Sequence, residues 1–414
     1  MVANDAKPFL ELSDSARSLR EQGAEIVAGG HRAAGMDAAD MIVVSPGVPP
    51  IPEVTDALKL GVPIIGEIEL ATQMLAHRAP VVAVGGTNGK STTTSLVGAF
   101  LVAQGKRVFV GGNLGEPLAN HTEEVFDAVV LEVSSFQLEH VHAFRPWVSA
   151  LLNITDDHLD RYSDFQEYAD TKGNAFAAQT HDDWAVIPIG DDMCERQARR
   201  GSGRAVTFGA GGDVEVTETA IIDRGVRFLR RHIALAGDHN AYNVAAAIAC
   251  VRPFHLDSDV IAQVLRDFEG LPHRTAFVTE VGGVRFYDDS KGTNVGASVA
   301  ALEGMHEARV VLIAGGRDKG GSYAPLATSL SRKGRAVVLL GEAADAIARA
   351  VGDVVPVRKA ATMEEAVRTA FGLASQGDAV LLSPACSSFD MFRDYKHRGT
   401  EFCQAATTLA AEVS

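Results

Sequence analysis

A short run of glycine, lysine and hydroxyl side chains near residue 90 has the composition of a phosphate-binding loop. The stretch from Pro80 to Thr94 reads PVVAVGGTNGKSTTT. Its apolar start predicts a buried parallel strand, and Lys90 opens a helical pattern that ends at Gly105. Between them, glycines let backbone N–H groups approach phosphate oxygens, Lys90 can place a charge at the terminal phosphates, and Ser91 can ligate Mg²⁺. The stretch therefore predicts a nucleoside triphosphate site.

This loop departs from the common pattern G-x-x-x-x-G-K-[ST]. Val84 stands where the first glycine of that pattern belongs, so the loop reads Gly86-x-x-Gly89-Lys90-Ser91 and is two residues tighter. A purely structural glycine turn is the alternative interpretation. The position of the Gly-Lys-Ser-Thr run between a strand and a helix favours phosphate binding.

Two further polar clusters follow predicted buried strands. Glu132 ends an apolar run just before a Ser-Ser-Phe-Gln sequence, and residues 153–160 read NITDDHLD. Ligands of open α/β sheets sit outside the carboxyl ends of the strands. Glu132 is therefore a candidate Mg²⁺ ligand, with a helix cap or surface carboxylate as the alternative. His158 is a candidate metal or phosphate ligand, with a satisfied loop histidine as the alternative. Lys172 lies in a helical stretch, 165–177, and by itself is most simply a solvated lysine.

Polar clusters recur at strand ends and helix starts farther along the chain. An Asp-His-Asn run begins a helical pattern, where capping is an equally good explanation. A His-Arg pair falls at a presumed hinge, from which the arginine can reach a phosphate with two hydrogen bonds. The last cluster ends a strand and is expected to start a helix whose N–H groups could bind an anion. The clusters are Asp238–Asn243, His273–Arg274, Asp288–Asn294, Gly315–Gly321 and Ser383–Asp390. Their shared placement is stronger evidence for one ligand site than any single motif.

Alternating apolar and helical runs divide the chain into three α/β segments, predicted as domains 1–66, 67–270 and 271–414. The succession of strands and helices predicts mostly parallel, Rossmann-like sheets, with a P-loop type sheet in the centre and an antiparallel excursion between Gly209 and Leu235. Gly282-Gly283 predicts the turn of a hairpin. The predicted strands are 25–28, 41–45, 62–65, 81–84, 107–110, 128–133, 148–154, 310–314, 337–340, 354–357 and 379–383. A nucleotide-binding α/β unit normally opens with a strand and a glycine turn, so we expect the chain to begin inside its first domain.

The composition of the chain excludes several classes of protein. The 414 residues carry a formal net charge of −15, which argues against nucleic acid or an anionic membrane as partner. No apolar run approaches the roughly 18 residues of a membrane span. The N-terminus lacks the regions of a signal peptide. Four scattered cysteines without a C-x-x-C pair suggest neither a disulfide framework nor a zinc site. This composition is typical of a soluble globular enzyme.

Taken in order, the motifs resemble those of the Mur ligase family over about nine-tenths of the chain, from about Ser45 to the C-terminus. The GTNGKST loop is shared with folylpolyglutamate synthases, whereas DDSKGTN and LSPACSSFDMF are typical of the branch that adds D-glutamate. The matching motifs are GGTNGKSTT, GGNLG, LEVSSFQLE, NITDDHLDRY, GDHNAYN, GLPHR, DDSKGTN, GGRDKGG and LSPACSSFDMF. The resemblance implies ATP-dependent addition of D-glutamate to UDP-N-acetylmuramoyl-L-alanine through an acyl phosphate, in peptidoglycan precursor synthesis. It also implies a monomer in the bacterial cytoplasm that needs Mg²⁺.

The resemblance assigns the ATP and metal sites to residues of this chain. It implies catalytic roles for Lys90, His158 and Lys172. Lys172 would be carbamylated, because an ammonium repels a cation whereas a carbamate supplies oxygen ligands. ATP would be held by Gly86, Thr87, Asn88, Gly89, Lys90, Ser91, Thr92, Asn240, Asn243, Arg274 and Asp289, and Mg²⁺ by Ser91, Glu132, His158 and Lys172.

The resemblance likewise assigns the other two substrates. The muramoyl substrate would be bound by Ser45, Gly47, Asn113 and Ser134, and D-glutamate by Lys291, Thr293, Lys319, Ser388, Phe389 and Tyr395. Two lysines and a helix N-terminus suit a dicarboxylate. Family members carry a further strand and glycine turn before the first residue here, so part of the UDP pocket is expected to lie outside this sequence. The C-terminal domain is expected to close over ATP about a hinge near Gly270–His273.

Three alternatives stay open at this point. A related ligase could take another amino acid, as folylpolyglutamate synthases or the meso-diaminopimelate adder do, and an amino-acid panel in a phosphate-release assay separates these. A non-catalytic protein would bind ATP without turnover, although Lys90, Glu132, His158 and Lys291 argue against it. A simple P-loop kinase is disfavoured by Val84, and it would leave a full third domain without a role.

Overall fold

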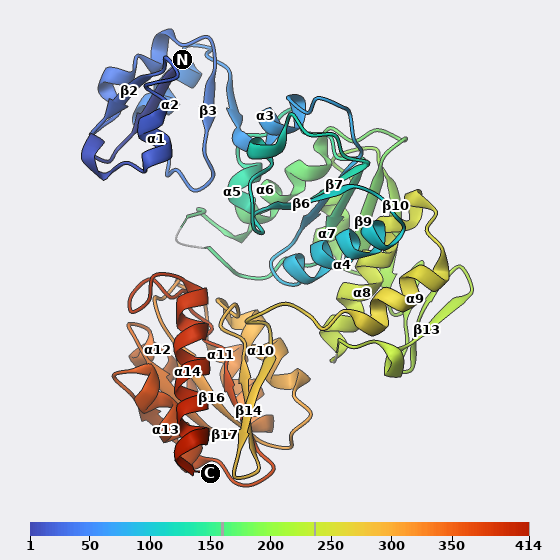
Figure 1. Ribbon diagram of the computed structural model, residues 1–414, viewed down its shortest axis with the longest axis vertical. Helices are drawn as coiled ribbons and strands as arrows, with labels where there is room; N and C mark the ends of the chain where they lie inside the picture. Colours follow the sequence, from blue (N-terminus) through green and yellow to red (C-terminus); the bar gives the residue numbers. More distant parts are fainter. Residues whose placement is uncertain (159–160, 236, 414) are drawn as a thin grey trace.

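The computed structural model of the protein describes residues 1–158, 161–235 and 237–413. The chain forms three successive α/β parts (Figure 1). The N-terminal part lies at the upper left of the view, the central sheet at the right, and the C-terminal part below, with the termini at opposite ends of the long axis. Of the polar cluster 153–160, residues Leu159 and Asp160 lie outside the described residues.

The N-terminal part contains two separate parallel strand pairs. β1 (Val2–Asp5) pairs with β2 (Glu25–Ala28), and β3 (Ile42–Val44) pairs with β4 (Ile64–Gly66). The three strands predicted for this segment correspond to β2, β3 and β4, although β4 starts two residues later than expected. The main helices here are α1 (Asp14–Ser18) and α2 (Pro52–Lys59), the second with proline in its first turn, where no backbone donor is needed.

The central part is built on one large sheet with helices on both faces. Its strands are β5 (Val81–Gly85), β6 (Val108–Gly112), β7 (Ala128–Glu132), β8 (Val148–Leu151), β9 (Trp184–Pro188), β10 (Arg204–Gly209), β11 (Val214–Val216), β12 (Ala220–Asp223) and β13 (Val226–Leu229). Within the described residues their order is β13-β12-β11-β10-β9-β8-β5-β7-β6. The inner strands are parallel and buried on both faces, which explains their continuous apolar sequences. β11, β12 and β13 are antiparallel, which confirms the predicted excursion.

Two hydrophobic clusters fix the central helices against this sheet. α4 (Lys90–Ala103), α8 (Asp238–Val251) and α9 (Ser258–Asp267) share one cluster, in which α8 is apolar over most of its length because it is enclosed by the sheet and α4. The other face is covered by α3 (Glu67–Gln73), α5 (Ser135–Leu138), α6 (Phe165–Ala177) and α7 (Asp192–Ala198). The strand ends that carry polar residues are thereby held at one edge of a rigid sheet.

The C-terminal part is a second sheet covered on both faces. Its strands are β14 (Ala276–Val281), β15 (Val284–Asp288), β16 (Val310–Gly315), β17 (Gly334–Leu340), β18 (Val357–Lys359) and β19 (Ala379–Leu382), in the order β14-β15-β19-β16-β17-β18 across the described residues. Gly282 and Gly283 form the predicted hairpin turn between β14 and β15. The covering helices are α10 (Val295–Gly304), α11 (Ala324–Lys333), α12 (Ala344–Val351), α13 (Met363–Leu373) and α14 (Tyr395–Val413). The two mostly parallel sheets confirm the predicted α/β fold class.

Several local predictions were wrong. The segment Ser383–Asp390 does not start a helix, because Ser387 forms an isolated bridge with Arg317 and α14 begins only at Tyr395. Neither Asp238 nor Asn240 caps α8, whose N-cap is Gly237. The strand predicted at 354–357 forms three residues later as β18, and β9 and α7 were not predicted.

Across the described residues, every helix is too short or too polar to cross a lipid bilayer.

Candidate active site

The glycine loop connects β5 to α4 in a conformation that only glycine adopts without strain. Gly86 has φ +137° and Gly89 has φ +86°. A Cβ on Gly89 would lie 2.2 Å from Oδ1 of Asn243, so a side chain has no room there. The loop is anchored to the end of β8, since Asn88 N donates to Asn153 Oδ1 at 2.9 Å and Thr87 N donates to Asn153 O at 3.0 Å. The loop is therefore held open at the carboxyl edge of the central sheet.

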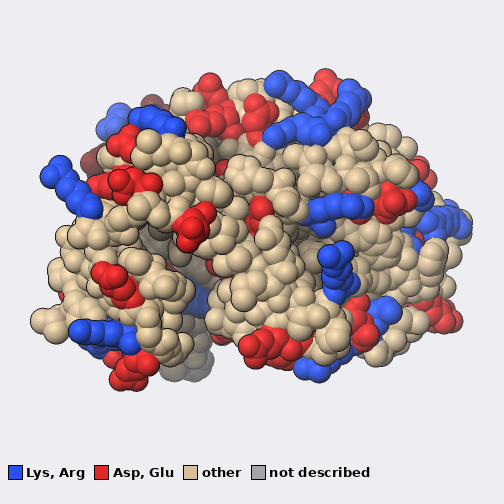
Figure 2. Space-filling model, turned by 90° about the horizontal axis from the view of Figure 1, so that it is seen from above, with Lys and Arg blue, Asp and Glu red and all other residues tan. Residues whose placement is uncertain are grey.

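A cavity of about 360 Å³ opens beside this loop, between the central and C-terminal parts. Its walls carry four lysines and an arginine, so positive charge is concentrated here in a chain of net charge −15. On the outer face drawn in Figure 2, by contrast, acidic and basic side chains are interspersed. The predicted site residues that line this cavity are Thr87, Asn88, Gly89, Lys90, Asn113, Glu132, Ser134, His158, Lys172, Arg274, Lys291, Thr293, Lys319, Ser388, Phe389 and Tyr395.

A second cavity, of about 430 Å³, shares Asn88, Gly89 and Arg274 with the first. It combines apolar walls with polar groups from α8 and from the start of the C-terminal part. The predicted nucleotide residues that line it are Asn88, Gly89, Thr92, Asn240, Asn243, Arg274 and Asp289. Sequence reasoning missed three other lining side chains, Phe208, His239 and Tyr242, of which the last two lie inside the GDHNAYN motif.

Glu132 ends β7 as a buried carboxylate with one oxygen in use. Asn113 Nδ2 donates to its Oε1 at 2.5 Å, whereas Oε2 is buried without a hydrogen-bond partner among the described residues. Burial acts to raise the pKa of Glu132. The charge of Lys90 and the neighbouring Ser91 and Asn113 side chains outweigh that effect, and the pKa lies below its usual value. The side chain thus presents an ionised, unshared oxygen, which suits a hard cation.

Lys172 comes from α6, and His158 comes from the segment that follows β8. Both lie beside the glycine loop and line the first cavity. Lys172 is buried, its Nζ donates to Gly86 O at 2.9 Å, and it lies 4.5 Å from the centre of the Tyr168 ring. Burial, with the charge of Lys90, holds the pKa of Lys172 well below its usual value. His158 has φ +54° and packs its ring 4.8 Å from that of Phe136. Among the described residues, no group of three or more His, Cys, Asp or Glu side chains is arranged to hold a metal ion.

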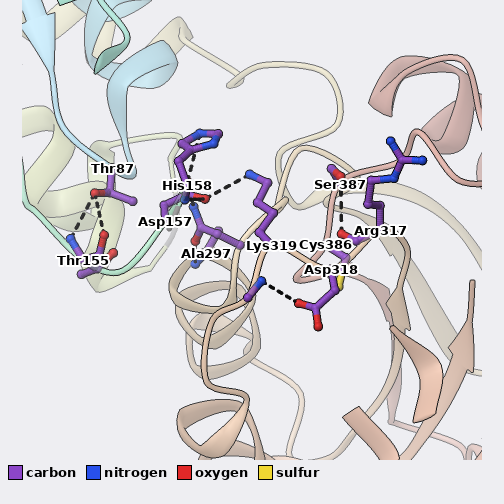
Figure 3. A network of polar contacts seen from close by, with 12 residues as sticks. Thr87, Thr155, Asp157, His158, Ala297, Arg317, Asp318, Lys319, Cys386 and Ser387 are labelled. Atoms are coloured by element: carbon purple, nitrogen blue, oxygen red, sulfur yellow. Dashed lines mark hydrogen bonds and ion pairs between the residues drawn. The ribbon is translucent and has the colours of Figure 1, made fainter. Parts of the chain in front are cut away.

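Polar contacts tie the C-terminal part to this loop region. Lys319 Nζ lies 3.0 Å from Asp157 Oδ1, and Asn294 Nδ2 donates to Asp157 Oδ2 and to Asn88 Oδ1, both at 3.1 Å. Figure 3 shows Lys319 reaching toward Asp157 beside His158. Although burial acts to raise it, the pKa of Asp157 lies below its usual value because of the charges of Lys319 and His158. Asp157 and Asn294 belong to quoted motifs but were given no role from the sequence.

Three further groups have environments that alter their ionisation. Burial raises the pKa of Asp289 to about 7, against hydrogen bonding from Ser383. Burial lowers the pKa of Lys291 to about 8, and its Nζ lies 4.0 Å from the centre of the Tyr395 ring. Burial also lowers the pKa of Lys90, whose Nζ donates to Thr87 O at 2.8 Å.

Four predicted residues line neither cavity. Gly86 and Ser91 lie directly behind the lining, where the Gly86 carbonyl accepts from Lys172 and the Ser91 hydroxyl accepts from Arg274 at 2.7 Å. Ser45 and Gly47 belong to the turn that follows β3 in the N-terminal part. The structure thus brings most of the predicted site together, and it leaves these two N-terminal residues apart from it.

Known proteins resemble this chain over almost its whole length. The family described as Mur ligase middle domain matches residues 84–251, and the one described as Mur ligase, glutamate ligase domain matches residues 273–386. The UDP-N-acetylmuramoylalanine--D-glutamate ligase of Trichlorobacter lovleyi is 42% identical over 422 residues, covering 99% of this chain and 93% of the relative. The protein of the same name from Geobacter metallireducens is 42% identical, covering 99% and 92%.

Solved structures share the fold at lower identity. The UDP-N-acetylmuramate-alanine ligase of Thermotoga maritima superposes with a TM-score of 0.62 at 20% identity, covering 98% of this chain and 93% of that one. Folylpolyglutamate synthase of Mycobacterium tuberculosis, solved with ADP, gives a TM-score of 0.66 at 15% identity, covering 83% and 93%.

Proposed function

This chain belongs to the Mur ligase family, and we propose that its two adjoining cavities carry out the ATP-dependent addition of D-glutamate to UDP-N-acetylmuramoyl-L-alanine. The observation that carries this proposal is that lysines from the central part and from the C-terminal part line one cavity. Lys90 comes from the glycine loop, whereas Lys291 and Lys319 come from the C-terminal part. A site that handles a triphosphate, a carboxylate and a dicarboxylate needs such a concentration of positive charge.

ATP would occupy the second cavity with its phosphates at the glycine loop. Backbone N–H groups at the start of α4, together with Lys90, would bind the phosphates. Asn240 and Asn243 would contact the base, while Arg274 and Asp289 would contact the rest of the nucleotide. Lys90 donates to Thr87 O and Arg274 donates to Ser91 Oγ, and both side chains would exchange these partners for phosphate oxygens when ATP binds.

The reaction would proceed in two steps. A carboxylate oxygen of the muramoyl substrate attacks the γ-phosphorus of ATP, and the bond from that phosphorus to the β-phosphate oxygen breaks. The products of this step are an acyl phosphate and ADP. The amine of D-glutamate then attacks the acyl carbon, and phosphate and a proton are lost as the amide forms. Lys90, Lys291 and Lys319 would stabilise the charge that develops on the transferring phosphoryl group and on the acyl oxygen.

Mg²⁺ fits the donors at the end of β7. The unshared, ionised Oε2 of Glu132 and the Ser91 hydroxyl would hold one ion. His158 and a carbamylated Lys172 would serve a second, for which the depressed pKa of Lys172 leaves a neutral amine able to combine with CO₂. Bound Mg²⁺ would neutralise phosphate charge during transfer.

D-glutamate would lie on the C-terminal side of the first cavity. Lys291 and Lys319 suit its two carboxylates, and Thr293, Ser388, Phe389 and Tyr395 would complete the pocket, with Asn113 and Ser134 facing the muramoyl substrate. Ser45 and Gly47 would contact the UDP-sugar. We place the monomeric enzyme in the bacterial cytoplasm, where ATP and UDP-linked sugars are available.

The experiment that tests this function measures phosphate release from ATP with UDP-N-acetylmuramoyl-L-alanine and D-glutamate, omitting each component in turn. Release that depends on both substrates is the expected result. Release with L-glutamate or meso-diaminopimelate in place of D-glutamate would assign another ligase, and ATP binding without any release would contradict catalysis.

A further inference from the structure

The turn after β3, residues 45–50, is fastened to the central part by one side chain. Arg161 donates from its terminal guanidinium nitrogen NH2 to the carbonyl of Val48 at 2.7 Å. Among the described residues this is the one hydrogen bond that joins the turn 45–50 to the central part. The N-terminal part is also joined to the central part through β4, where Gly66 N donates to His140 O at 2.6 Å and the His142 ring lies 3.0 Å from Ile64 O.

Arg161 is itself held on the central part by a carboxylate and a ring. Its Nε and NH2 donate to the two oxygens of Glu139 at 3.1 and 2.6 Å, and its guanidinium lies 5.7 Å from the centre of the Phe136 ring. Tyr162 also donates to Glu139, at 3.0 Å. The side chains of Arg161 and Glu139 are 14% and 15% exposed, so water competes weakly for this pair.

The same residue contacts the turn that carries His158. Arg161 N donates to His158 O at 2.9 Å, and Phe136, beneath the guanidinium, packs against the His158 ring. Arg161 therefore connects three segments: its guanidinium contacts the N-terminal turn and the α5 segment at Glu139 and Phe136, and its backbone N–H contacts the His158 turn. A lysine has no fork with which to chelate Glu139 and reach Val48 together.

We propose that Arg161 is a positioning residue that holds the N-terminal turn 45–50 in register with the His158 turn. A UDP-sugar bound at the turn then presents its distant carboxylate at the Lys90 loop. This role rests on the proposed function, because it assumes that Ser45 and Gly47 contact the UDP-sugar. Its basis in the structure, the polar connection of the turn 45–50 through Val48 O, does not depend on that function.

The test compares Arg161→Lys, Arg161→Met and Glu139→Gln with a matched control, Arg368→Met. Arg368 forms a similar two-bond pair with Glu412, at 2.6 and 2.8 Å, on the C-terminal part and outside both cavities. In both Arg161 variants the KM for UDP-N-acetylmuramoyl-L-alanine should rise about tenfold, as expected for a lost bond to a charged group. The KM for ATP, and the kinetics of the control, should stay at wild-type values.

The double variant Arg161→Met/Glu139→Gln should be no worse than Arg161→Met, because the two residues act as one unit. A wild-type KM in Arg161→Lys would overturn the proposal, since charge alone would then suffice. An equal rise in the KM for ATP would also overturn it, because the effect would then act through the glycine loop.

A readout without substrate separates this inference from the proposed function. Hydrogen–deuterium exchange of residues 42–50 in the ligand-free protein should be several times faster in Arg161→Met than in the wild type or in Arg368→Met. Unchanged exchange of residues 42–50 in Arg161→Met would overturn the proposal that Arg161 holds this turn in place. A wild type that releases no phosphate would contradict the proposed function alone, and the exchange result would still decide the role of Arg161.

Discussion

At the scale of single residues, the chemistry at position 172 depends on removing the charge of a lysine. Lys172 is buried between the glycine loop and Tyr168, close enough to Lys90 for their charges to repel. Both effects favour the neutral amine, which is the form that reacts with CO₂. The environment that would exclude an ammonium is thus the one that prepares a carbamate.

Lys172 should therefore take up CO₂ reversibly. Protein equilibrated with ¹³C-bicarbonate should give a carbamate signal in the ¹³C NMR spectrum, stronger at alkaline than at acidic pH because the reacting form is the neutral amine. The signal should be absent in Lys172→Arg. A signal that persists in this variant would place the carbamate elsewhere.

Asp289 should make stability depend on pH in the direction opposite to that of an ordinary carboxylate. Its pKa is about 7 in the folded protein, against the ordinary 3.8 of an aspartate, so the folded state binds the extra proton between these values. Stability is then lost as pH rises through this window, by roughly 1.4 kcal/mol per unit of pKa difference as an upper bound. Urea unfolding of wild type and Asp289→Asn at several pH values should show the variant gaining relative stability as pH rises. Parallel profiles would contradict the raised pKa.

Glu132 offers a test of the metal site by a change of one atom. Glu132→Gln keeps the shape that Asn113 contacts but removes the charge on the unshared oxygen. Activity should fall about 10- to 100-fold, with a higher Mg²⁺ concentration needed for half-maximal rate, as for other altered metal environments. A Mg²⁺ titration of the phosphate-release rate checks this, and an unchanged midpoint would remove Glu132 from the metal site.

At the scale of elements, the junction of β5 and α4 depends on space as well as on backbone conformation. Gly89 and Gly105 both have φ near +85°, but only at Gly89 would a Cβ meet another atom, the Asn243 side chain. The two positions therefore separate backbone strain from steric exclusion.

Gly89→Ala should lose ATP binding and also stability, whereas Gly105→Ala should cost about 1 kcal/mol through its left-handed backbone and keep activity. Nucleotide affinity by calorimetry and thermal unfolding measure the two effects. Equal losses in both variants would show that strain alone, and not the contact with Asn243, limits this position.

At the scale of the whole molecule, polar contacts join the central and C-terminal parts beside the glycine loop. Lys319 and Asn294 both reach Asp157, across more than a hundred residues of sequence. They hold Lys291 and Lys319 of the C-terminal part near Lys90 of the central part.

Replacing Lys319 and Asn294 together, by Met and Ala, should weaken this closed arrangement. Small-angle scattering of the ligand-free double variant should give a larger radius of gyration than the wild type, with Arg368→Met as the unchanged control. Identical profiles for all three proteins would show that other contacts keep the parts together.

The sequence pattern predicted those features of the fold that depend on residues close together in the chain. The glycine loop, the Gly282-Gly283 hairpin and the helix 165–177 were predicted because each depends on residues adjacent in sequence. The helix predicted to start within Ser383–Asp390 was wrong, because the backbone of Ser387 forms a bridge with Arg317, which is distant in sequence. The helix α14 begins only at Tyr395. For the same reason the pairing of Lys319 with Asp157, and of Arg161 with Val48, could not be predicted from spacing.

The bond between Arg274 and Ser91 has a consequence for how tightly ATP can bind. The Arg274 guanidinium donates to the Ser91 hydroxyl at 2.7 Å, so in the proposed site ATP would compete with this internal contact. The apparent dissociation constant is then the intrinsic one divided by the fraction of molecules in which the contact is broken. Affinity for ATP would in this way be set partly by an equilibrium inside the protein, and a distant change that favours the Arg274–Ser91 contact would weaken binding without altering the nucleotide site.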